Sequence, residues 1–314
     1  MNKKKPPVIV LIGPTAVGKT QLSIMLAASL NAEIISGDSM QIYKRMDIGT
    51  AKIKDEEMNG IPHHLLDIKE PTESFSVAEY QEIVRGKMAE IESRGKLPMI
   101  VGGTGLYIQS VLYDYSFTEE AGDPGFRTEM EALSLKKGSD YIHGLLKERD
   151  PEAAKSIHPN NMRRVIRALE ILHTTGKTMS DHMEIQQKEL LYNTALVGLT
   201  MDRDVLYDRI NKRVDHMMDE GLLEEVKQLY DEKVRNCQSV QAIGYKELYA
   251  YFEGNASLPE AVETLKRNSR RYAKRQLTWF RNKMDIAWFD MTPPVKIEQK
   301  KQEIFSCIAG KLEI

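Results

Sequence analysis

The sequence predicts an α/β fold in which a parallel sheet is flanked by helices and carries an inserted all-helical domain. Strand-like and helix-like segments alternate through the N-terminal third, which is typical of a parallel sheet. A strand-like segment returns at residues 194–200 after a long stretch without one. The chain has 314 residues, more than one hydrophobic core usually spans. We therefore expect a core domain at residues 1–114 and 194–314 and a helical domain at 115–193.

The first strand and the first helix flank a glycine-rich loop. Val8–Ile12 is a run of five apolar residues, which fits a strand buried on both faces. Lys19–Leu30 has apolar residues at helical spacing, so the loop at Gly13–Gly18 connects a strand to a helix. That context is typical of a P-loop, and the core is therefore predicted to be P-loop NTPase-like.

Further elements follow in alternation. Glu33–Ser36 is predicted as a strand, and Ser76 begins a capping box that predicts a helix to about Arg94. Leu97–Val101 predicts the next strand, which ends at a run of glycines. After the helical insertion and the strand at 194–200, long helices are predicted at 205–230 and 258–283.

Composition excludes several classes of protein. Hydrophobic residues make up 41% and charged residues 29% of the chain, which excludes disordered and collagen-like proteins. Cys237 and Cys307 are too few for a disulfide framework and share no metal-type spacing with the histidines. We therefore expect a reducing cytoplasm and no structural metal. No apolar stretch is long enough for a signal peptide or a membrane span, and the sequence indicates no protein partner.

The segment GPTAVGKT matches every fixed position of the pattern G-x-x-x-x-G-K-[ST]. In such a loop, successive backbone N–H groups face phosphate oxygens, Lys19 supplies a positive charge, and the Thr20 hydroxyl suits Mg²⁺. Mg²⁺ is the cofactor that this pattern predicts. The predicted phosphate-binding residues are Gly13, Pro14, Thr15, Ala16, Val17, Gly18, Lys19 and Thr20.

The loop does not identify the phosphate. The same loop fits the β- and γ-phosphates of a nucleotide such as ATP, or the diphosphate of an ester. The sequence has no H-R-D loop of the kind that protein kinases use for catalysis. A small-molecule kinase and a group transferase with a diphosphate leaving group both remain.

Two polar residues follow predicted strands, at the edge of the sheet where ligands bind. Asp38 could ligate Mg²⁺ or act as a general base towards an acceptor, and its alternative role is an Asx-turn after Gly37. Thr104 could orient an acceptor through its hydroxyl, and its alternative role is a helix N-cap.

Arginine pairs occur on two predicted helices. Arg163 and Arg167 share a helix face, which fits a lid over an anion, an RNA contact or an ordinary solvated surface. Arg209 and Arg213, at positions i and i+4, could complete a clamp on a diphosphate. The sequence does not separate the roles of Arg209 and Arg213.

The predicted helix at 258–283 carries a strongly basic segment. Eight basic residues and no acidic one lie between Lys266 and Lys283, in a chain whose net charge is −2. Tyr272 and Trp279 lie seven residues apart on another face of that helix. Cations interleaved with aromatic residues suit phosphate contacts and base stacking, so a polyanionic partner is predicted. The alternative is an exposed amphipathic helix with Trp279 in the core.

Seven stretches, taken together, resemble the tRNA dimethylallyltransferase family, also called isopentenyl-diphosphate:tRNA transferases. They are GPTAVGKT, ISGDSMQIYKRMDIGTAK, IPHHLLDI, VGGTGLYI, NNMRRVIRALEI, QAIGYKE and RRYAKRQLTWFR. They occur in the family's order from residue 13 to residue 281, so the resemblance covers most of the chain. An ordered set of this kind is far more specific than the P-loop alone.

The resemblance implies a substrate and a role for each matched residue. The P-loop would hold the diphosphate of dimethylallyl diphosphate, and the prenyl group would pass to the exocyclic amine of an adenosine just 3′ to the anticodon of tRNA. By position, Asp38 would be the general base and Thr104 would orient the acceptor. The residues that would contact tRNA are Asp38, Ser39, Met40, Gln41, Thr104, Arg127, Asn161, Met162, Arg163, Arg164, Val165, Gln241, Gly244, Tyr245, Lys246, Lys274, Arg275, Gln276, Trp279 and Arg281.

Two departures qualify the resemblance. Eukaryotic members carry a C-terminal zinc finger, and this sequence lacks its cysteines and histidines, which implies a bacterial type. Many relatives are expected to have arginine at the position of Gln241, so the resemblance does not support a charge-dependent tRNA contact there, although it still supports the family.

Two other classes of function are weighed against prenyl transfer. An ATP-dependent small-molecule kinase would use the same P-loop with the helical domain as a lid, but it would have no use for the basic helix. A nucleotide-gated RNA-binding protein would need no chemistry, and the placement of Asp38 and Thr104 at neighbouring strand ends argues against it.

Overall fold

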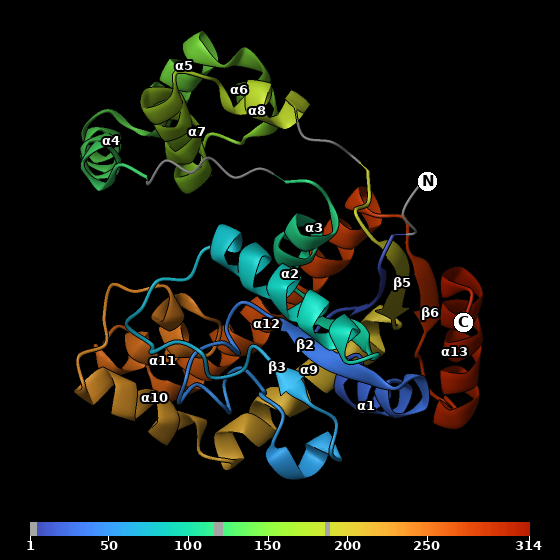
Figure 1. Ribbon diagram of the computed structural model, residues 1–314. Coiled ribbons are helices and arrows are strands. Elements are labelled where there is room, and N and C mark those ends of the chain that lie inside the picture. The colour runs from blue at the N-terminus through green and yellow to red at the C-terminus, as the bar shows by residue number, and fades with distance from the viewer. Residues whose placement is uncertain (1–4, 116–121, 186–188) are drawn as a thin grey trace. The chain divides into compact units, whose positions relative to one another are not determined.

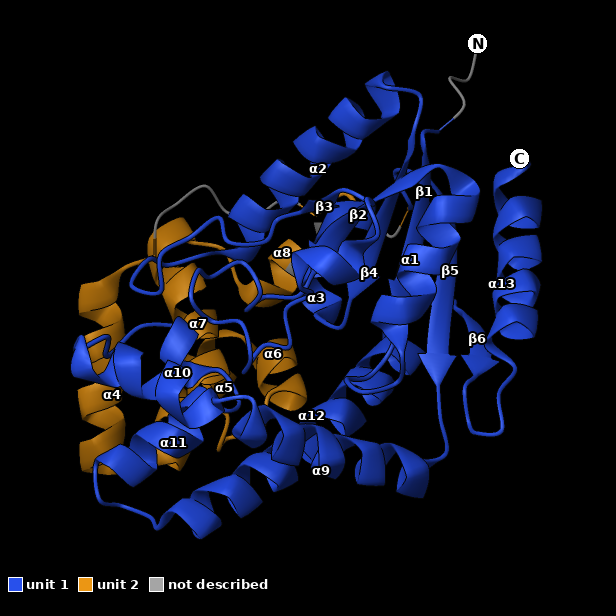
Figure 2. Ribbon diagram, turned by 90° about the horizontal axis from the view of Figure 1, so that it is seen from below, with its two compact units in different colours: residues 1–112, 190–314 blue, residues 113–189 orange. Residues whose placement is uncertain are grey.

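The computed structural model describes residues 5–115, 122–185 and 189–314, and the chain divides into two compact units. Unit 1 spans 1–112 and 190–314, and unit 2 spans 113–189 (Figure 2). These divisions lie two to four residues before the predicted ones at 114/115 and 193/194. The backbone N–H of Leu191 donates to the carbonyl of Leu112, which ties both connecting segments to unit 1.

Unit 1 contains a six-stranded sheet with the order β3-β2-β4-β1-β5-β6 (Figure 1). Every paired strand is parallel, so the predicted α/β class with a parallel sheet is confirmed. The strands are β1 (Pro7–Ile12), β2 (Ala32–Gly37), β3 (His63–His64), β4 (Leu97–Gly102), β5 (Asn193–Thr200) and β6 (Ala287–Asp290).

Helices cover both faces of the sheet in unit 1 (Figure 1). On one face, α1 and α13 contact each other, and their buried side chains share a hydrophobic core with alternate residues of β1 and β5. On the other face, α2 packs on β4 and against α3. The helices of this unit are α1 (Lys19–Leu30), α2 (Val77–Ser93), α3 (Gly105–Leu112), α9 (Arg203–Asp219), α10 (Leu222–Asp231), α11 (Tyr245–Phe252), α12 (Leu258–Lys283) and α13 (Ile297–Leu312), with short 3₁₀ turns at Asp55–Met58 and Ser239–Gln241.

Several element boundaries agree with those predicted. Helix α1 occupies the predicted range, α12 spans the predicted 258–283, and the Ser76 hydroxyl caps α2 by accepting from the N–H of Glu79 at 3.1 Å. The prediction of a single helix at 205–230 is wrong, because this region forms two helices. Gly221 has a φ of 102°, in the left-handed region that a helix cannot continue through, and it separates α9 from α10.

The edge strands β3 and β6 were not predicted. The two residues of β3 place His64 Nε2 at 2.7 Å from Glu33, which is 3% exposed. Arg94 and Lys96 also lie within 3.0 Å of the same carboxylate. His64 therefore belongs to an ion-pair cluster at the sheet's amino end.

The regular elements of unit 2, over the described residues 122–185, are helices. Buried residues of α4 to α7 form its own hydrophobic core, which includes Ile142, Leu146 and Val165. Across the described residues of both units, no helix is both long and apolar enough to cross a membrane. The helices of unit 2 are α4 (Pro124–Lys137), α5 (Ser139–Arg149), α6 (Pro151–Ser156), α7 (Met162–Thr175) and α8 (Met179–Ile185).

Candidate active site

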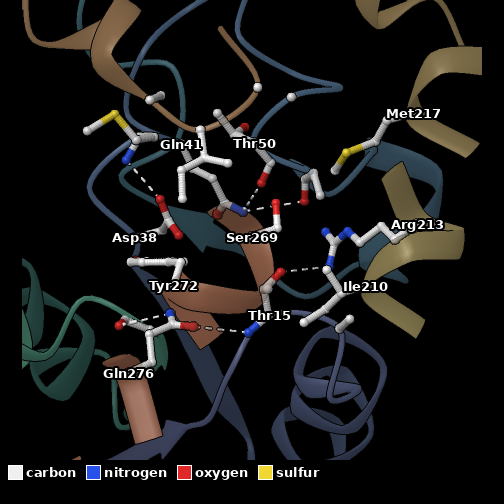
Figure 3. A pocket seen from close by; sticks show the side chains of 18 of the residues that line it. Thr15, Asp38, Gln41, Thr50, Ile210, Arg213, Met217, Ser269, Tyr272 and Gln276 are labelled. Carbon is white, nitrogen blue, oxygen red and sulfur yellow. Dashed lines mark hydrogen bonds between the residues drawn. The ribbon is translucent and has the colours of Figure 1, made fainter. Parts of the chain in front are cut away.

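A cavity of about 700 Å³ opens in unit 1 at the carboxyl ends of β1, β2 and β4. Asp38 and Gln276 lie on one side of it, and Arg213 and Met217 lie on the opposite side (Figure 3). This is the edge of a parallel sheet at which the sequence predicts a ligand site. Thirteen further residues that the sequence analysis predicts to bind phosphate or tRNA line the cavity: Thr15, Ala16, Gly18, Lys19, Thr20, Ser39, Met40, Gln41, Arg209, Gln241, Gly244, Lys246 and Arg275.

The P-loop has the geometry of an anion-binding nest. Ala16 and Gly18 have positive φ angles of 64° and 103°, whereas Val17 between them does not. Alternation of positive and negative φ along a short loop turns successive N–H groups towards one side. The ammonium of Lys19 donates to the carbonyls of Gly13 and Pro14 at 2.9 and 2.8 Å. The side chain of Val17, by contrast, is 1% exposed and packs in the core, so a predicted contribution of Val17 to phosphate binding is limited to its backbone.

Two cations lie close together at this loop. Burial and the charge of Arg213 lower the pKa of Lys19 to about 7, against the opposite effect of Asp38. Burial likewise lowers the pKa of Arg213, whose Nη1 donates to the Thr15 hydroxyl at 3.3 Å. Arg209 is exposed on the same helix and lines the same cavity. The site therefore contains two neighbouring cationic groups, Lys19 and Arg213, whose charged forms a bound anion would stabilise.

Asp38 forms the turn that was its alternative role, and it also borders the cavity. Its Oδ1 accepts the backbone N–H of Met40 at 2.8 Å, which is the predicted Asx-turn. The carboxylate also lines the cavity that contains Lys19. The turn orients Asp38 while leaving a carboxylate oxygen available for proton transfer.

Thr104 acts on the same turn from the end of β4. Its hydroxyl accepts the N–H of Ser39 at 3.2 Å and lies 3.4 Å from the Ser39 hydroxyl, and its own N–H donates to the Gly37 carbonyl. Thr104 is not among the residues that line the cavity. In this conformation it supports the turn that carries Asp38.

Helix α12 contributes less to an exposed surface than predicted. Lys274, Arg275 and Arg281 are exposed, but Trp279 is half-buried and Gln276 is 6% exposed. The Gln276 side chain accepts from the backbone N–H of Thr15 and donates to the carbonyl of Gly103. Gln276 is thus absent from the exposed face of α12 and borders the cavity instead, and its predicted contact with tRNA stays a prediction.

Tyr272, also on α12, lines the cavity. Burial and the charge of Asp38 raise its pKa above the usual range of tyrosine, so its hydroxyl stays protonated. A base could therefore stack on Tyr272 only by entering the cavity, and the base-stacking role stays a prediction.

The segment QAIGYKE is divided between the cavity and the core. Gln241, Gly244 and Lys246 line the cavity. Tyr245 is fully buried, and its hydroxyl donates to Glu225 at 2.6 Å, so its predicted contact with tRNA is contradicted.

The predicted tRNA-binding residues of unit 2 lie mainly on α7. Asn161, Arg163 and Arg164 are exposed and Met162 is half-buried, whereas Val165 is buried in the core of the unit and cannot present its side chain to a partner. Arg127 of α4 is exposed, but its Nε lies 2.6 Å from Glu170, a buried carboxylate that also binds Arg167. Arg127 therefore has a structural partner as well as an accessible surface.

The sequence analysis missed the apolar wall of the cavity. Ile210, Val214 and Met217 line it from α9, and Leu265 lines it from α12. The three residues of α9 are spaced i, i+4 and i+7 and adjoin the two arginines of the predicted clamp. That spacing was a usable signal for an apolar group held beside an anion.

Comparisons with known proteins agree with this arrangement. The family model described as IPP transferase matches residues 41–283. The tRNA dimethylallyltransferases of Bacillus licheniformis and Bacillus subtilis are 85% and 71% identical over the full length of both chains. The crystal structure of the full-length tRNA isopentenylpyrophosphate transferase from Bacillus halodurans is 56% identical, with a TM-score of 0.75, and the match covers 99% of this chain and 97% of that one.

A more distant solved structure, of a eukaryotic dimethylallyltransferase acting on tRNA, is 33% identical with a TM-score of 0.80. The match covers 95% of this chain and 77% of that one. The identity over the whole length and the matched family model lead to one conclusion. The chain belongs to the IPP transferase family.

Proposed function

We propose that this protein transfers a dimethylallyl group from dimethylallyl diphosphate to the exocyclic N6 amine of an adenosine 3′-adjacent to the anticodon in tRNA, with release of diphosphate. The observation that carries the proposal is the shared cavity of Lys19 and Asp38, which brings a phosphate-binding loop and a potential base together. The names of the full-length relatives support the same substrates. A tRNA substrate would be met in the cytoplasm.

The donor's diphosphate fits the P-loop. Backbone N–H groups of the loop and the ammonium of Lys19 would hold its oxygens. Arg213 is a stronger candidate for the second cation than Arg209, because Arg213 already contacts Thr15 while Arg209 is exposed. The dimethylallyl group would lie towards the apolar wall formed by Ile210 and Met217.

Mg²⁺ fits this site only together with the donor. Within the described residues, no group of three or more His, Cys, Asp or Glu side chains could hold a metal ion. Thr20 offers a hydroxyl in the cavity, and Mg²⁺ is commonly bound by few protein oxygens together with phosphate oxygens and water. A bound Mg²⁺ would neutralise charge on the diphosphate and so make it a better leaving group.

The reaction requires one proton to be removed as the new bond forms. The N6 nitrogen of adenine forms a bond to C1 of the dimethylallyl group while the bond from C1 to the diphosphate oxygen breaks. The electron pair of that bond leaves with the diphosphate, and Asp38 accepts the proton from N6. Lys19 and Arg213 stabilise the charge that develops on the departing group.

Exposed cations in each unit suit the backbone of tRNA. Lys274 and Arg275 are exposed on α12 of unit 1, and Arg163 and Arg164 are exposed on α7 of unit 2. Phosphate contacts position a nucleic acid, and the target adenosine must leave its stack to reach a cavity of this kind. The cost of unstacking, a few kcal/mol, would be offset by these contacts.

The test is incubation of the protein with dimethylallyl diphosphate, Mg²⁺ and unmodified tRNA, followed by mass spectrometry of the nucleosides. We expect a prenyl mass increment on adenosine. Asp38→Asn keeps an oxygen that can accept the Met40 N–H but cannot take up the proton, so transfer should fall by roughly 10²–10⁴-fold while the Kd for tRNA is retained. Phosphorylation of a small hydroxyl compound by ATP, without prenyl transfer, would contradict the proposal in favour of a kinase.

A further inference from the structure

Glu225, on α10, lies outside every predicted site, yet its carboxylate accepts four hydrogen bonds from two separate segments. The backbone N–H groups of Asp47 and Ile48 donate to Oε2 at 2.9 and 2.8 Å. The N–H of Gly49 and the hydroxyl of Tyr245 donate to Oε1 at 3.0 and 2.6 Å. Hydrogen bonds to an ionised carboxylate are about twice as strong as neutral ones, so Glu225 fastens residues 47–49 to α10.

Tyr245 and Gly49 fit together at this anchor. A Cβ atom on Gly49 would lie 2.5 Å from the Tyr245 ring, which is too close for a residue with a side chain to fit at this position. Burial and the charge of Glu225 raise the pKa of Tyr245 well above its ordinary value, so the hydroxyl remains a donor. Only glycine permits this approach of the backbone to the ring and the carboxylate.

The loop at 47–51 has internal hydrogen bonds, but these connect near neighbours. The N–H of Ala51 donates to the Ile48 carbonyl at 3.0 Å, and the Thr50 hydroxyl donates to the Met46 carbonyl at 2.6 Å. Such bonds maintain the shape of the loop. Its place relative to the rest of unit 1 depends on longer-range contacts, and Glu225 makes three of them to consecutive residues.

A chain of hydrogen bonds leads from this loop to Asp38. Gln41 donates through Nε2 to the carbonyls of Thr50 and Ala51 at 3.2 and 3.4 Å. The Ser36 hydroxyl donates to Gln41 Oε1 at 3.0 Å, and the N–H of Asp38 lies 3.4 Å from the same hydroxyl. Gln41, Thr50 and Asp38 border one cavity (Figure 3).

We propose that Glu225 is a positioning residue for the transfer reaction: by anchoring the loop at 47–51, it sets the place of Asp38 through Gln41 and Ser36. The inference rests on the proposed role of Asp38 as the base. It predicts that loss of the anchor affects the chemical step, because the P-loop and the exposed cations of α12 lie on other elements.

The test compares Glu225→Gln with Glu224→Gln. Both substitutions remove one negative charge from the first turn of α10, but Glu224 is exposed and makes none of the contacts described for Glu225. In Glu225→Gln, an amide nitrogen replaces one carboxylate oxygen, and this nitrogen cannot accept a hydrogen bond from the backbone N–H groups that face it. We expect kcat at saturating substrates to fall at least tenfold, with KM for the donor and Kd for tRNA within twofold of wild type. Glu224→Gln should match wild type in all three.

Backbone hydrogen exchange supplies a second readout that does not depend on activity. Exchange at residues 47–49 should accelerate at least tenfold in Glu225→Gln, while exchange in β1 stays unchanged. Tyr245→Phe, which removes a single donor, should accelerate exchange at Gly49 and provides the same test if Glu225→Gln does not fold.

Three outcomes would be decisive. Faster exchange with kcat within twofold of wild type would overturn the positioning role. A fall in kcat without faster exchange at 47–49 would show that Glu225 does not act through this loop. Absence of prenyl transfer by the wild-type protein would instead defeat the proposed function, and the exchange measurement would still decide whether Glu225 holds the loop.

Discussion

The side-chain oxygen of Gln276 accepts the backbone N–H of Thr15 at 3.2 Å, which joins the basic helix α12 directly to the phosphate-binding loop. The Gln276 nitrogen donates to the carbonyl of Gly103 at the end of β4, so one amide spans three elements. The N–H of Thr15 is consequently directed at α12. Gln276 therefore helps to hold α12 against the P-loop.

Two replacements of Gln276 should have different effects on stability and on donor binding. Gln276→Met leaves the N–H of Thr15 and the carbonyl of Gly103 without partners, at about 1–3 kcal/mol for each buried group. We expect the free energy of unfolding, measured in urea, to fall by about 2–6 kcal/mol. Gln276→Glu retains an acceptor for Thr15 and should cost less stability, but its negative charge beside the P-loop should raise KM for the donor. An equal effect of both variants on KM would contradict this account.

The low pKa of Lys19 predicts a pH dependence of donor use. The pKa is about 7 in the protein without an anion, and a bound diphosphate favours the charged ammonium and so raises it. The affinity for the donor is therefore highest below about pH 7, where Lys19 is charged, and it falls as the pH rises above 7. We expect kcat/KM for dimethylallyl diphosphate, at saturating tRNA, to decline above about pH 7. Lys19→Met should be less active and should lack this inflection, and a flat wild-type profile between pH 6 and 9 would refute the assignment.

The cluster around Glu33 predicts stability at acid pH. Burial alone would raise the pKa of Glu33, but hydrogen bonds from His64, Lys96 and Arg94 outweigh it and lower the pKa to about 2 from 4.5. Because the folded-state pKa is the lower one, the stabilisation is present above about pH 4.5 and is lost as the pH falls towards 2. Its size is about 3 kcal/mol, at 1.4 kcal/mol for each pH unit of displacement.

Glu33→Gln should therefore reduce the free energy of unfolding by about 3 kcal/mol at pH 7, with a smaller loss at pH 3. Glu90→Gln is the matched control, since Glu90 also pairs with Arg94 at 2.6 Å but its side chain is half-exposed. An exposed pair contributes about 1 kcal/mol or less. Urea unfolding of the two variants at both pH values makes the comparison, and equal losses would rule out a special role for burial.

The parts of the fold that the sequence predicted are those with strong local patterns. The apolar run of β1, the glycine loop and the cap at Ser76 each identify an element from adjacent residues alone. The break at Gly221 was missed because the apolar spacing continues across it, although a glycine within a helical pattern was visible. The strand β3 has two residues and forms through pairing with β2, so no local pattern marks it.

The site shows the same division. The P-loop motif and Asp38 could be proposed as site residues from the sequence because their local chemistry depends on nearby residues in the chain. Gln276 and Glu225 could not, because their partners lie far away in sequence: Thr15 is 261 residues from Gln276, and Gly49 is 176 residues from Glu225. A glutamine within a basic segment suggests an exposed surface, and only the packing of α12 on the P-loop shows that it is buried.

The exposed cations of α12 give a prediction about tRNA binding. Lys274 and Arg275 are exposed and adjacent to the buried Gln276, so their charges can reach a nucleic acid without disturbing the core. Each phosphate contact contributes about 0.7–0.9 to the slope of log K against log salt concentration. The double substitution of both residues by alanine should therefore weaken tRNA binding and reduce the magnitude of that slope by about 1.5.

The matched control replaces Lys296 and Lys311, which are exposed near the two ends of α13, by alanine. It changes the net charge by the same amount, and neither lysine belongs to the predicted tRNA surface. Filter binding at several salt concentrations should show a wild-type slope for this control. A reduced slope in both variants would indicate that tRNA responds to total charge, whereas a reduced slope in the α12 variant alone would establish a local contact, because counterion release counts only the phosphates that the protein neutralises.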